Sequence, residues 1–267
     1  MAAANTTQAS IIPRQAGFFR DLLSIAGRAI RSIPRDPEAV IPALIIPIFF
    51  FGVNVGALQD IAEQLPGIDY KAFQLPVAIV FAVTGISRAN VLVIDIQSGY
   101  FDRLALTPVH RLALLLGLMV ADFVLVVALT IPVLILGLIV GVEFSSGLLG
   151  MLLFILLAGL WGLVYTGFPY AVALKTGNPA AVNSSFLIFF PFMFLTTAFL
   201  PLEALTGWMA AIARFNPMTY LLDALRALIT VGWSFEDLLG GILAIAAVGV
   251  VSIGLSLWAL QGRVRRR

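Results

Sequence analysis

Long apolar runs alternate with short polar stretches along almost the entire chain. A helix needs about 20 mostly apolar residues to cross a bilayer, whose hydrocarbon core is about 30 Å thick. The runs of about this length cover residues 39–59, 73–96, 112–141, 147–174, 182–200 and 238–260. Prolines within them, Pro169 and Pro191 among others, predict kinked helices. The pattern therefore predicts an all-α, polytopic membrane protein with six transmembrane helices.

An amphipathic pattern precedes the first apolar run. Polar residues recur every three or four positions and form one narrow helical face: Arg20, Ser24, Arg28, Arg31 and Arg35. The opposite face is apolar: Phe18, Phe19, Leu22, Leu23, Ala26, Ala29, Ile30 and Ile33. We expect an interfacial helix over residues 13–36, with its apolar side in the membrane surface and its arginines toward anionic head groups. This helix either only anchors the topology or also docks a partner. Residues 1–12 are expected to be a disordered lead, and residues 37–267 the six-span transmembrane domain.

Composition supports a membrane protein and argues against several other classes. Hydrophobic residues make up 61% of the chain and charged residues 11%, and the mean hydropathy is +1.04, far from the values of soluble domains. The net charge of +2 gives no basis for a nucleic-acid partner. The chain has no cysteine and one histidine, so we expect no metal site.

Basic residues are concentrated on one side of the predicted topology. An even number of spans places both termini on the same side, and the positive-inside rule makes that side cytoplasmic. Its basic residues are Arg14, Arg20, Arg28, Arg31, Arg35, Arg103, Arg111, Lys175, Arg263, Arg265, Arg266 and Arg267. The opposite side holds Lys71, Arg214 and Arg226. We expect a multi-pass protein of the cytoplasmic membrane with both termini in the cytoplasm.

A short polar segment, "YFDRLALTPVHR", separates the second and third predicted spans. Its pattern predicts an amphipathic helical turn that Pro108 stops, lying across the membrane surface. The only histidine, His110, is interpreted as a solvated loop residue.

This loop resembles that of a known family. "DIQSGYFDRLALTPVHR" (residues 95–111) resembles the loop after the second span in permeases of ABC transporter type-2 (ABC-2) exporters, where it forms the coupling helix seated in a cleft of the ATPase subunit. The match falls on Asp95, Gly99, Asp102, Arg103, Leu104, Thr107, Pro108 and Arg111, and with Tyr100 these residues are the expected ATPase-coupling site. The family's run of charges before the glycine is reduced here to Asp95.

A second stretch, "FLPLEALTGWMAAIARFNPMTYLLDALRAL", resembles the signature of the same family between its fifth and sixth spans. The matching residues are Pro201, Glu203, Trp208, Asn216, Pro217, Thr219, Tyr220, Asp223 and Arg226. They are interpreted as two short outer helices, broken at Asn216 and Pro217, that serve as an outer gate or dimer rim. The alternative is an ordinary outer loop in which Trp208 and Tyr220 are aromatic-belt residues.

The chain has no ATP-binding motif of its own, because a P-loop needs a lysine directly after a glycine and neither Lys71 nor Lys175 follows one. The resemblance implies that a separate ABC ATPase subunit binds ATP and Mg²⁺. It also implies that two permease chains, identical or different, pair with two ATPase chains. The overall pattern is most similar to the daunorubicin-resistance type, whose expected cargo is an amphipathic drug or a lipid-like molecule. No catalytic residue is expected.

Two ionisable residues fall within predicted spans. Counted at 1.5 Å per residue, Arg88 lies about 14 Å and Asp122 about 16 Å from the cytoplasmic loop edges of adjacent antiparallel helices. Equal depth allows an intramembrane salt bridge, and the pair is either structural or part of a polar lining for a translocation route.

Three other functions would each leave a pattern of their own in the sequence. A permease for polysaccharide, teichoic acid or glycolipid would need aromatic platforms for sugars, and "FLIFFPFMF" (Phe186–Phe194) is either such a platform or lipid-facing bulk, the reading we favour. A secondary transporter or channel would show ionisable relays or inverted repeats. A membrane transferase would show clustered acids and histidines near one interface. The sequence has one such ionisable pair and no repeat, and its acids are scattered through the outer loops, so both functions are weaker alternatives. The direction of transport stays open.

Overall fold

A computed structural model describes residues 17–35, 37–62, 69–84, 86–105 and 111–265. The residues described form helices and connecting segments, without strands. In chain order the elements are α1 (Phe18–Ser32), η1 (Ile33–Arg35), α2 (Pro37–Ala62), α3 (Tyr70–Thr84), α4 (Ala89–Gln97), α5 (Tyr100–Ala105), α6 (Arg111–Ile139), α7 (Gly147–Tyr165), α8 (Gly167–Thr176), α9 (Pro179–Phe194), η2 (Leu202–Ala204), α10 (Gly207–Phe215), α11 (Pro217–Thr230) and α12 (Phe235–Arg265). The predicted all-α class is confirmed.

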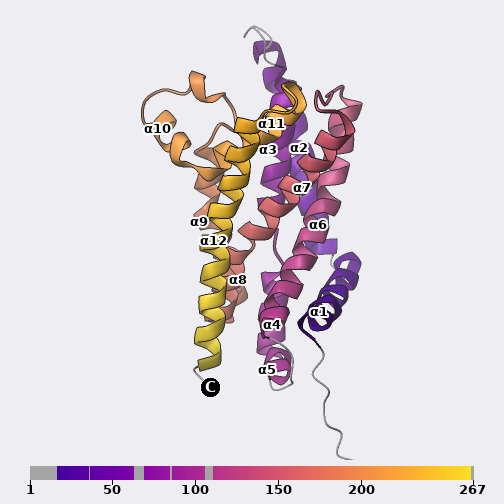
Figure 1. Ribbon diagram of the computed structural model, residues 1–267, viewed down its shortest axis with the longest axis vertical. Coiled ribbons are helices and arrows are strands. Elements are labelled where there is room, and N and C mark those ends of the chain that lie inside the picture. The colour runs from indigo at the N-terminus through magenta and orange to yellow at the C-terminus, as the bar shows by residue number, and fades with distance from the viewer. Residues whose placement is uncertain (1–16, 36, 63–68, 85, 106–110, 266–267) are drawn as a thin grey trace, which may run out of the picture.

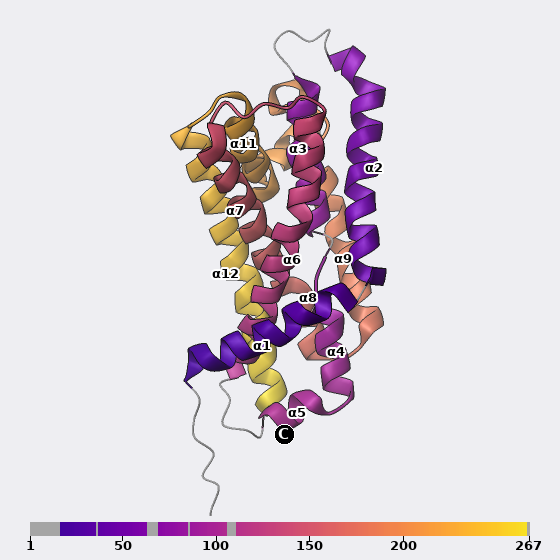
Figure 2. The same cartoon turned by 90° about the vertical axis from the view of Figure 1, so that its right-hand side faces the viewer.

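The long helices run side by side and give the molecule two distinct ends (Figure 1). One end carries α5 and the C-terminal end of α12, and we call it the α5 end. The opposite end carries α10 and α11, and we call it the α11 end. Helix α1 lies across the bundle near the α5 end rather than along it (Figure 2).

Five helical stretches in the described part of the chain are long and apolar enough to cross a membrane: Val40–Gln59, Tyr70–Gln97, Leu112–Ile139, Gly147–Thr176 and Phe235–Arg263. They match five of the six predicted spans. The predicted span over residues 182–200 is wrong in its extent, because helix α9 ends at Phe194 and the chain continues without helix to Leu200.

Two of the spanning stretches are broken partway. In the second, α3 ends at Thr84 and α4 begins at Ala89. In the fourth, a turn at Thr166 separates α7 from α8. Pro169 explains this second break, because it has no backbone N–H to donate to the carbonyl of Tyr165, four residues earlier. The predicted kink at this proline is confirmed.

The apolar core is divided at the level of these breaks. One cluster, which we call the outer cluster, contains buried residues of α2, α3, α6, α7, α11 and α12, such as Phe51, Leu75 and Phe154. A second cluster contains residues of α1, α4, α6, α8 and the end of α12, such as Leu92, Leu118 and Leu174. The second cluster therefore belongs to the α5 end, and we call it the inner cluster.

Helix α1 lies within residues 13–36, where the interfacial helix is expected, and its placement in a membrane surface stays a prediction. It packs on α6 closely enough that a Cβ on Gly117 would meet Ile25 at 2.8 Å. Part of the predicted apolar face packs against the rest of the protein and part of it is exposed. Ala26 and Ala29 are buried, whereas Phe19 and Leu23 are 77% and 67% exposed. The expected disordered lead, residues 1–12, lies outside the described residues.

The contact of α8 with α12 gives a test of this packing. We expect Gly167→Ala to lower the free energy of unfolding by about 1–3 kcal/mol, because the new Cβ would lie 2.7 Å from the backbone carbon of Ser252, which has no flexible side chain to move aside. Thermal unfolding in detergent measures the effect. Gly254→Ala on α12, where a Cβ meets nothing within 4 Å, is the matched control and should leave stability unchanged or slightly higher. Equal behaviour of the two variants would contradict the packing.

Candidate functional site

Within the described part of the predicted coupling segment, residues Tyr100–Ala105 form a short helix, α5, at one end of the bundle. Gly99 adopts a positive φ of 71°, which turns the chain from α4 into α5 and favours glycine there. Phe101 is buried in the inner cluster, while Tyr100 is 37% exposed and Arg103 is exposed. The predicted coupling residues Thr107 and Pro108 lie outside the described residues, as do the side chains of Asp102, Leu104 and Arg111.

Asp95, the acid assigned to ATPase coupling, has a partner within the chain. Its carboxylate lies 3.1 Å from the Arg28 guanidinium of α1. The same guanidinium lies 4.9 Å from the ring centroid of Tyr100. Arg28 therefore ties α1 to the end of α4 and the start of α5, and a role of Asp95 toward an ATPase stays a prediction.

Polar contacts also tie α4 to α8 and α9. The Gln97 side chain donates to the backbone oxygen of Gly177, which follows α8, at 3.0 Å. Nearer the break in the second span, the Asn90 amide donates to the Asn183 amide oxygen of α9 at 2.8 Å. Helices α4, α8 and α9 are thus linked at two levels on the α5 side of the break.

Arg88 and Asp122 meet, as their equal depth allows, but through the backbone of Arg88 rather than through a salt bridge. Asp122 Oδ1 accepts from the backbone N–H of Arg88 at 3.1 Å, and the Arg88 guanidinium donates to the Ser32 hydroxyl of α1 at 2.7 Å. Asp122 Oδ2 accepts from the Tyr170 hydroxyl of α8 at 2.7 Å. The Asp122 side chain is fully buried.

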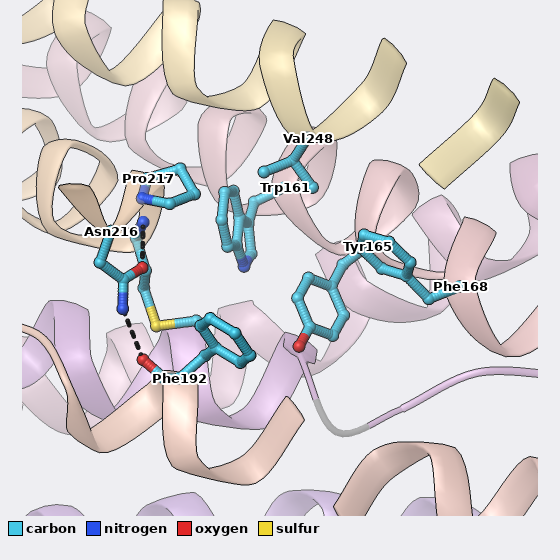
Figure 3. A pocket seen from close by; sticks show the side chains of 8 residues that line it. Trp161, Tyr165, Phe168, Phe192, Asn216, Pro217 and Val248 are labelled. Atoms are coloured by element: carbon cyan, nitrogen blue, oxygen red, sulfur yellow. Dashed lines mark hydrogen bonds between the residues drawn. The ribbon is translucent and has the colours of Figure 1, made fainter. Parts of the chain in front are cut away.

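At the α11 end, distant side chains hold the irregular segment that follows α9. The Asn216 amide donates to the backbone oxygens of Phe192 and Leu195, at 2.8 Å each, and its oxygen accepts from Met218 N–H to cap α11 (Figure 3). Gln74 of α3 donates to the Ala198 oxygen at 3.0 Å. Irregular backbone at membrane depth requires such partners.

Arg226 holds the same segment with most of its guanidinium. It donates to the Thr197 hydroxyl at 2.9 Å and to the Thr197 backbone oxygen at 2.6 Å, and more weakly to the Phe73 oxygen at 3.3 Å. The guanidinium lies 3.6 Å from the Phe73 ring centroid, and Asp223 is 3.5 Å away. Arg226 therefore joins α11, α3 and the segment after α9.

The structure groups only part of the predicted outer-gate set. Asn216, Pro217, Asp223 and Arg226 lie on α11 or at its start, and the break between α10 and α11 falls at Asn216 as predicted. The remaining described members lie apart from the Asn216 and Arg226 contacts. Trp208 is 69% exposed on α10, Glu203 is exposed on η2 after Pro201, and the Tyr220 hydroxyl donates to the Arg214 backbone oxygen.

Two apolar hollows lie on either side of α9. A small one of about 170 Å³ is lined by Trp161, Tyr165, Phe168, Phe192, Asn216, Pro217, Met218 and Val248 (Figure 3). A larger one of about 600 Å³, which we call the α2–α9 groove, is lined by Pro42, Ala43, Ile46, Pro47, Phe50, Phe81, Ala82, Ile86, Ser87, Asn90, Asn183, Phe186, Phe190, Met193 and Phe194. Three phenylalanines of the "FLIFFPFMF" stretch therefore face this groove.

Burial sets the ionisation of the Asp223 and Arg226 pair. Loss of solvent raises the pKa of Asp223 from 3.8 to about 6, against the opposing effect of Arg226 and with smaller contributions from Asp237 and Glu203. Burial likewise lowers the pKa of Arg226 to about 10, and Asp223 opposes this shift. Both shifts have burial as their largest cause, so the pair stabilises less than its charges suggest.

Several residues of these contacts were not predicted from the sequence: Ser32, Gln74, Tyr170, Asn183 and Thr197. Gln74 carried the clearest signal, since an amide within an otherwise apolar span needs a partner. Within the described residues, no three His, Asp or Glu side chains come together as a metal site would require.

The Arg226 contacts generate a prediction about side-chain shape. Arg226→Lys keeps the positive charge but loses the planar fork that reaches both Thr197 oxygens, so we expect the free energy of unfolding to fall by about 1.5–3 kcal/mol. Thermal unfolding in detergent reports it. Arg214→Lys, at an exposed position on α10, is the control. If both variants unfold alike, Arg226 does not hold the segment.

Asp223 generates a prediction about pH. Its pKa is higher in the folded chain than the ordinary 3.8, so its stabilising contribution is full below pH 3.8 and is lost as the pH rises through about 6. Asp223→Asn should therefore flatten the fall in melting temperature between about pH 4 and pH 7. An unchanged pH profile in this variant would show that Asp223 does not titrate there.

Comparison with known proteins bears on this arrangement. The chain is 27% identical over 239 residues to "Daunorubicin resistance ABC transporter permease protein DrrB1" of Streptomyces coeruleorubidus, covering 85% of this chain and 80% of that protein. It is 26% identical over 238 residues to "Probable doxorubicin resistance ABC transporter permease protein DrrC" of Mycobacterium tuberculosis, covering 88% and 86%.

The sequence model of the ABC-2 type transporter family matches residues 20–230. This match spans both stretches that resemble the family, from α1 to the end of α11. Permeases of this family are membrane-embedded transport subunits whose ATPase is a separate protein. The chain therefore belongs to the ABC-2 type transporter family.

Proposed function

We propose that this chain is the membrane subunit of an exporter that moves apolar or amphipathic molecules, drug-like compounds first among them, out of the cytoplasm. The observation that carries this proposal is the α2–α9 groove. Its lining includes Ser87 and Asn90, which lie where the second span breaks and α4 begins. The names of the two relatives, which concern daunorubicin and doxorubicin resistance, favour a drug as the cargo.

The chemistry of the groove favours a largely apolar cargo. Rings of α2, α3 and α9 make a continuous aromatic wall, with centroid separations of 5.2 Å for Phe50 and Phe81 and 5.6 Å for Phe81 and Phe194. The polar lining residues are Ser87, Asn90 and Asn183. A polysaccharide would need many more hydrogen-bonding groups than these three, so the groove gives the sugar-exporter alternative little support.

We further propose the membrane arrangement that this function requires. Helix α9 is 16 residues long, about 24 Å, and the non-helical residues after it complete a sixth crossing. The α5 end, with α1 and the C-terminal end of α12, is then cytoplasmic, and α1 lies in the interface with Phe19 and Leu23 in the lipid. The working unit pairs this chain with a second permease and with ATPase subunits that bind ATP and Mg²⁺.

Energy enters at α5 in this proposal. Phe101 fixes the helix to the inner cluster, which leaves Tyr100 and Arg103 exposed for contact with an ATPase. A displacement of α5 passes to α4 and, through Asn90 and Asn183, to the wall of the groove.

Reconstitution with its ATPase tests the function. We expect this chain and the ATPase encoded beside it to co-purify, and daunorubicin to stimulate ATP hydrolysis in vesicles. Tyr100→Ala combined with Arg103→Glu should lower the stimulated rate by at least about 10-fold, since anchoring residues of an interface contribute about 2 kcal/mol or more. Trp233→Ala, at an exposed position between α11 and α12, should not. Equal rates for both variants, or the absence of a complex, would contradict the proposal.

A further inference from the structure

The N-terminal ends of helices α4 and α8 both form hydrogen bonds with the carboxylate of Asp122. Arg88, the residue before α4, gives its backbone N–H to Asp122 Oδ1, and Tyr170 in the first turn of α8 gives its hydroxyl to Asp122 Oδ2. Asp122 itself lies in the middle of α6, which is continuous from Arg111 to Ile139. Two broken spans are therefore fixed to one unbroken span at a single side chain.

The other ends of α4 and α8 are joined as well. Gln97, the last residue of α4, donates to the backbone oxygen of Gly177, just after α8. Between these two levels, buried apolar residues of both helices belong to the inner cluster, among them Leu92, Ile96, Ala173 and Leu174. Helices α4 and α8 are thus joined at their N-terminal ends, along their length and at their C-terminal ends.

Helix α5 belongs to the same assembly. It follows α4 after Ser98 and Gly99, and Phe101 adds its ring to the inner cluster. The residues beyond the breaks, on α3 and α7, contribute to the separate outer cluster instead. Apolar packing therefore joins α4, α5 and α8 to one another and to the α5 side of α6, and the continuous helices α6 and α12 carry apolar packing past the level of the breaks to the outer cluster.

We propose that α4, α5 and α8 move as one block against α3 and α7, and that Asp122 of the continuous helix α6 is the positioning residue about which this block turns. A carboxylate suits this role because each oxygen accepts over a broad range of directions, so both hydrogen bonds survive a change in helix angle. The inference rests on the proposed function, in which an ATPase displaces α5.

The block has a direct consequence for the cargo groove. Helix α9 begins two residues after Gly177, with Asn178 as its N-cap, so α9 follows the end of α8. Turning the block therefore shifts Phe186 and Phe190 against α2, across the groove. A displacement of α5 by the ATPase therefore changes the width of the groove directly, because α9 moves with the block.

Paired spin labels measure the motion, because the chain contains no native cysteine. Labels at the exposed positions Ile94 on α4 and Lys175 on α8 report distances within the block. Labels at Lys175 and Leu152, which is 55% exposed on α7, report distances across the break. With the ATPase bound and ATP trapped by vanadate, we expect the second distance to shift and the first to stay constant. Equal shifts of both would overturn the block.

Variants test the role of Asp122 separately. Tyr170→Phe removes one of its two hydrogen bonds and should lower the ratio of stimulated to basal ATP hydrolysis about 2- to 12-fold per folded complex. A purely structural loss would lower both rates together and leave the ratio unchanged, which would refute the positioning role. Thr130→Val is the matched control, because its buried hydroxyl donates to Val126 of its own helix.

The permease alone separates the two proposals. In lipid without the ATPase, Asp122→Ala and the milder Gln97→Ala should each broaden the distance between labels at Ile94 and Lys175. Unchanged distributions in both variants would overturn the block even if export is real. If the distributions broaden but no ATPase binds, the block stands as a structural unit and the exporter function fails.

Discussion

Every break of a helix within a membrane frees backbone groups, and these groups must find partners in the protein because lipid offers none. The chain meets this constraint at three places with side chains from distant elements. Asp122 accepts from the N–H of Arg88 after the first break, and the Ser252 hydroxyl donates to the Val164 carbonyl at the second. Asn216 and Arg226 donate to carbonyls beyond the end of α9. Each break is therefore fixed by a contact that spans tens of residues.

These satisfied breaks divide the protein into parts with different tasks. The inner cluster carries α5, the exposed face of which suits an ATPase, and the outer cluster carries the packed wall of α3, α7 and α11. Helix α9 is attached at both ends of the molecule. At the α5 end it follows α8, and at the α11 end Asn216 and Arg226 hold the segment after it. A groove bounded by α9 can thus respond to movement at the α5 end while its other end stays attached.

The sequence predicted this architecture in the parts that periodicity and hydropathy control. Apolar runs located five spans, and helical counting brought Arg88 and Asp122 to the same depth. Counting fixes height but not rotation about the helix, so it could not foresee that the Arg88 guanidinium turns to Ser32. Hydropathy also missed the end of α9 at Phe194, because the residues that follow are nearly as apolar. The family resemblance found Asn216 and Arg226, whereas their shared task of holding one irregular segment required the structure.

Distant side chains supply the hydrogen bonds that backbone groups lose where spans break. Hydrogen exchange at the backbone N–H of Arg88 tests this most directly. Residue-resolved hydrogen exchange in lipid nanodiscs should find this N–H protected like amides in the middle of α6, although no residue of its own helix accepts from it. Asp122→Ala should make the same amide exchange rapidly while amides of α12 stay protected. Rapid exchange at Arg88 in the unmodified protein would contradict the account.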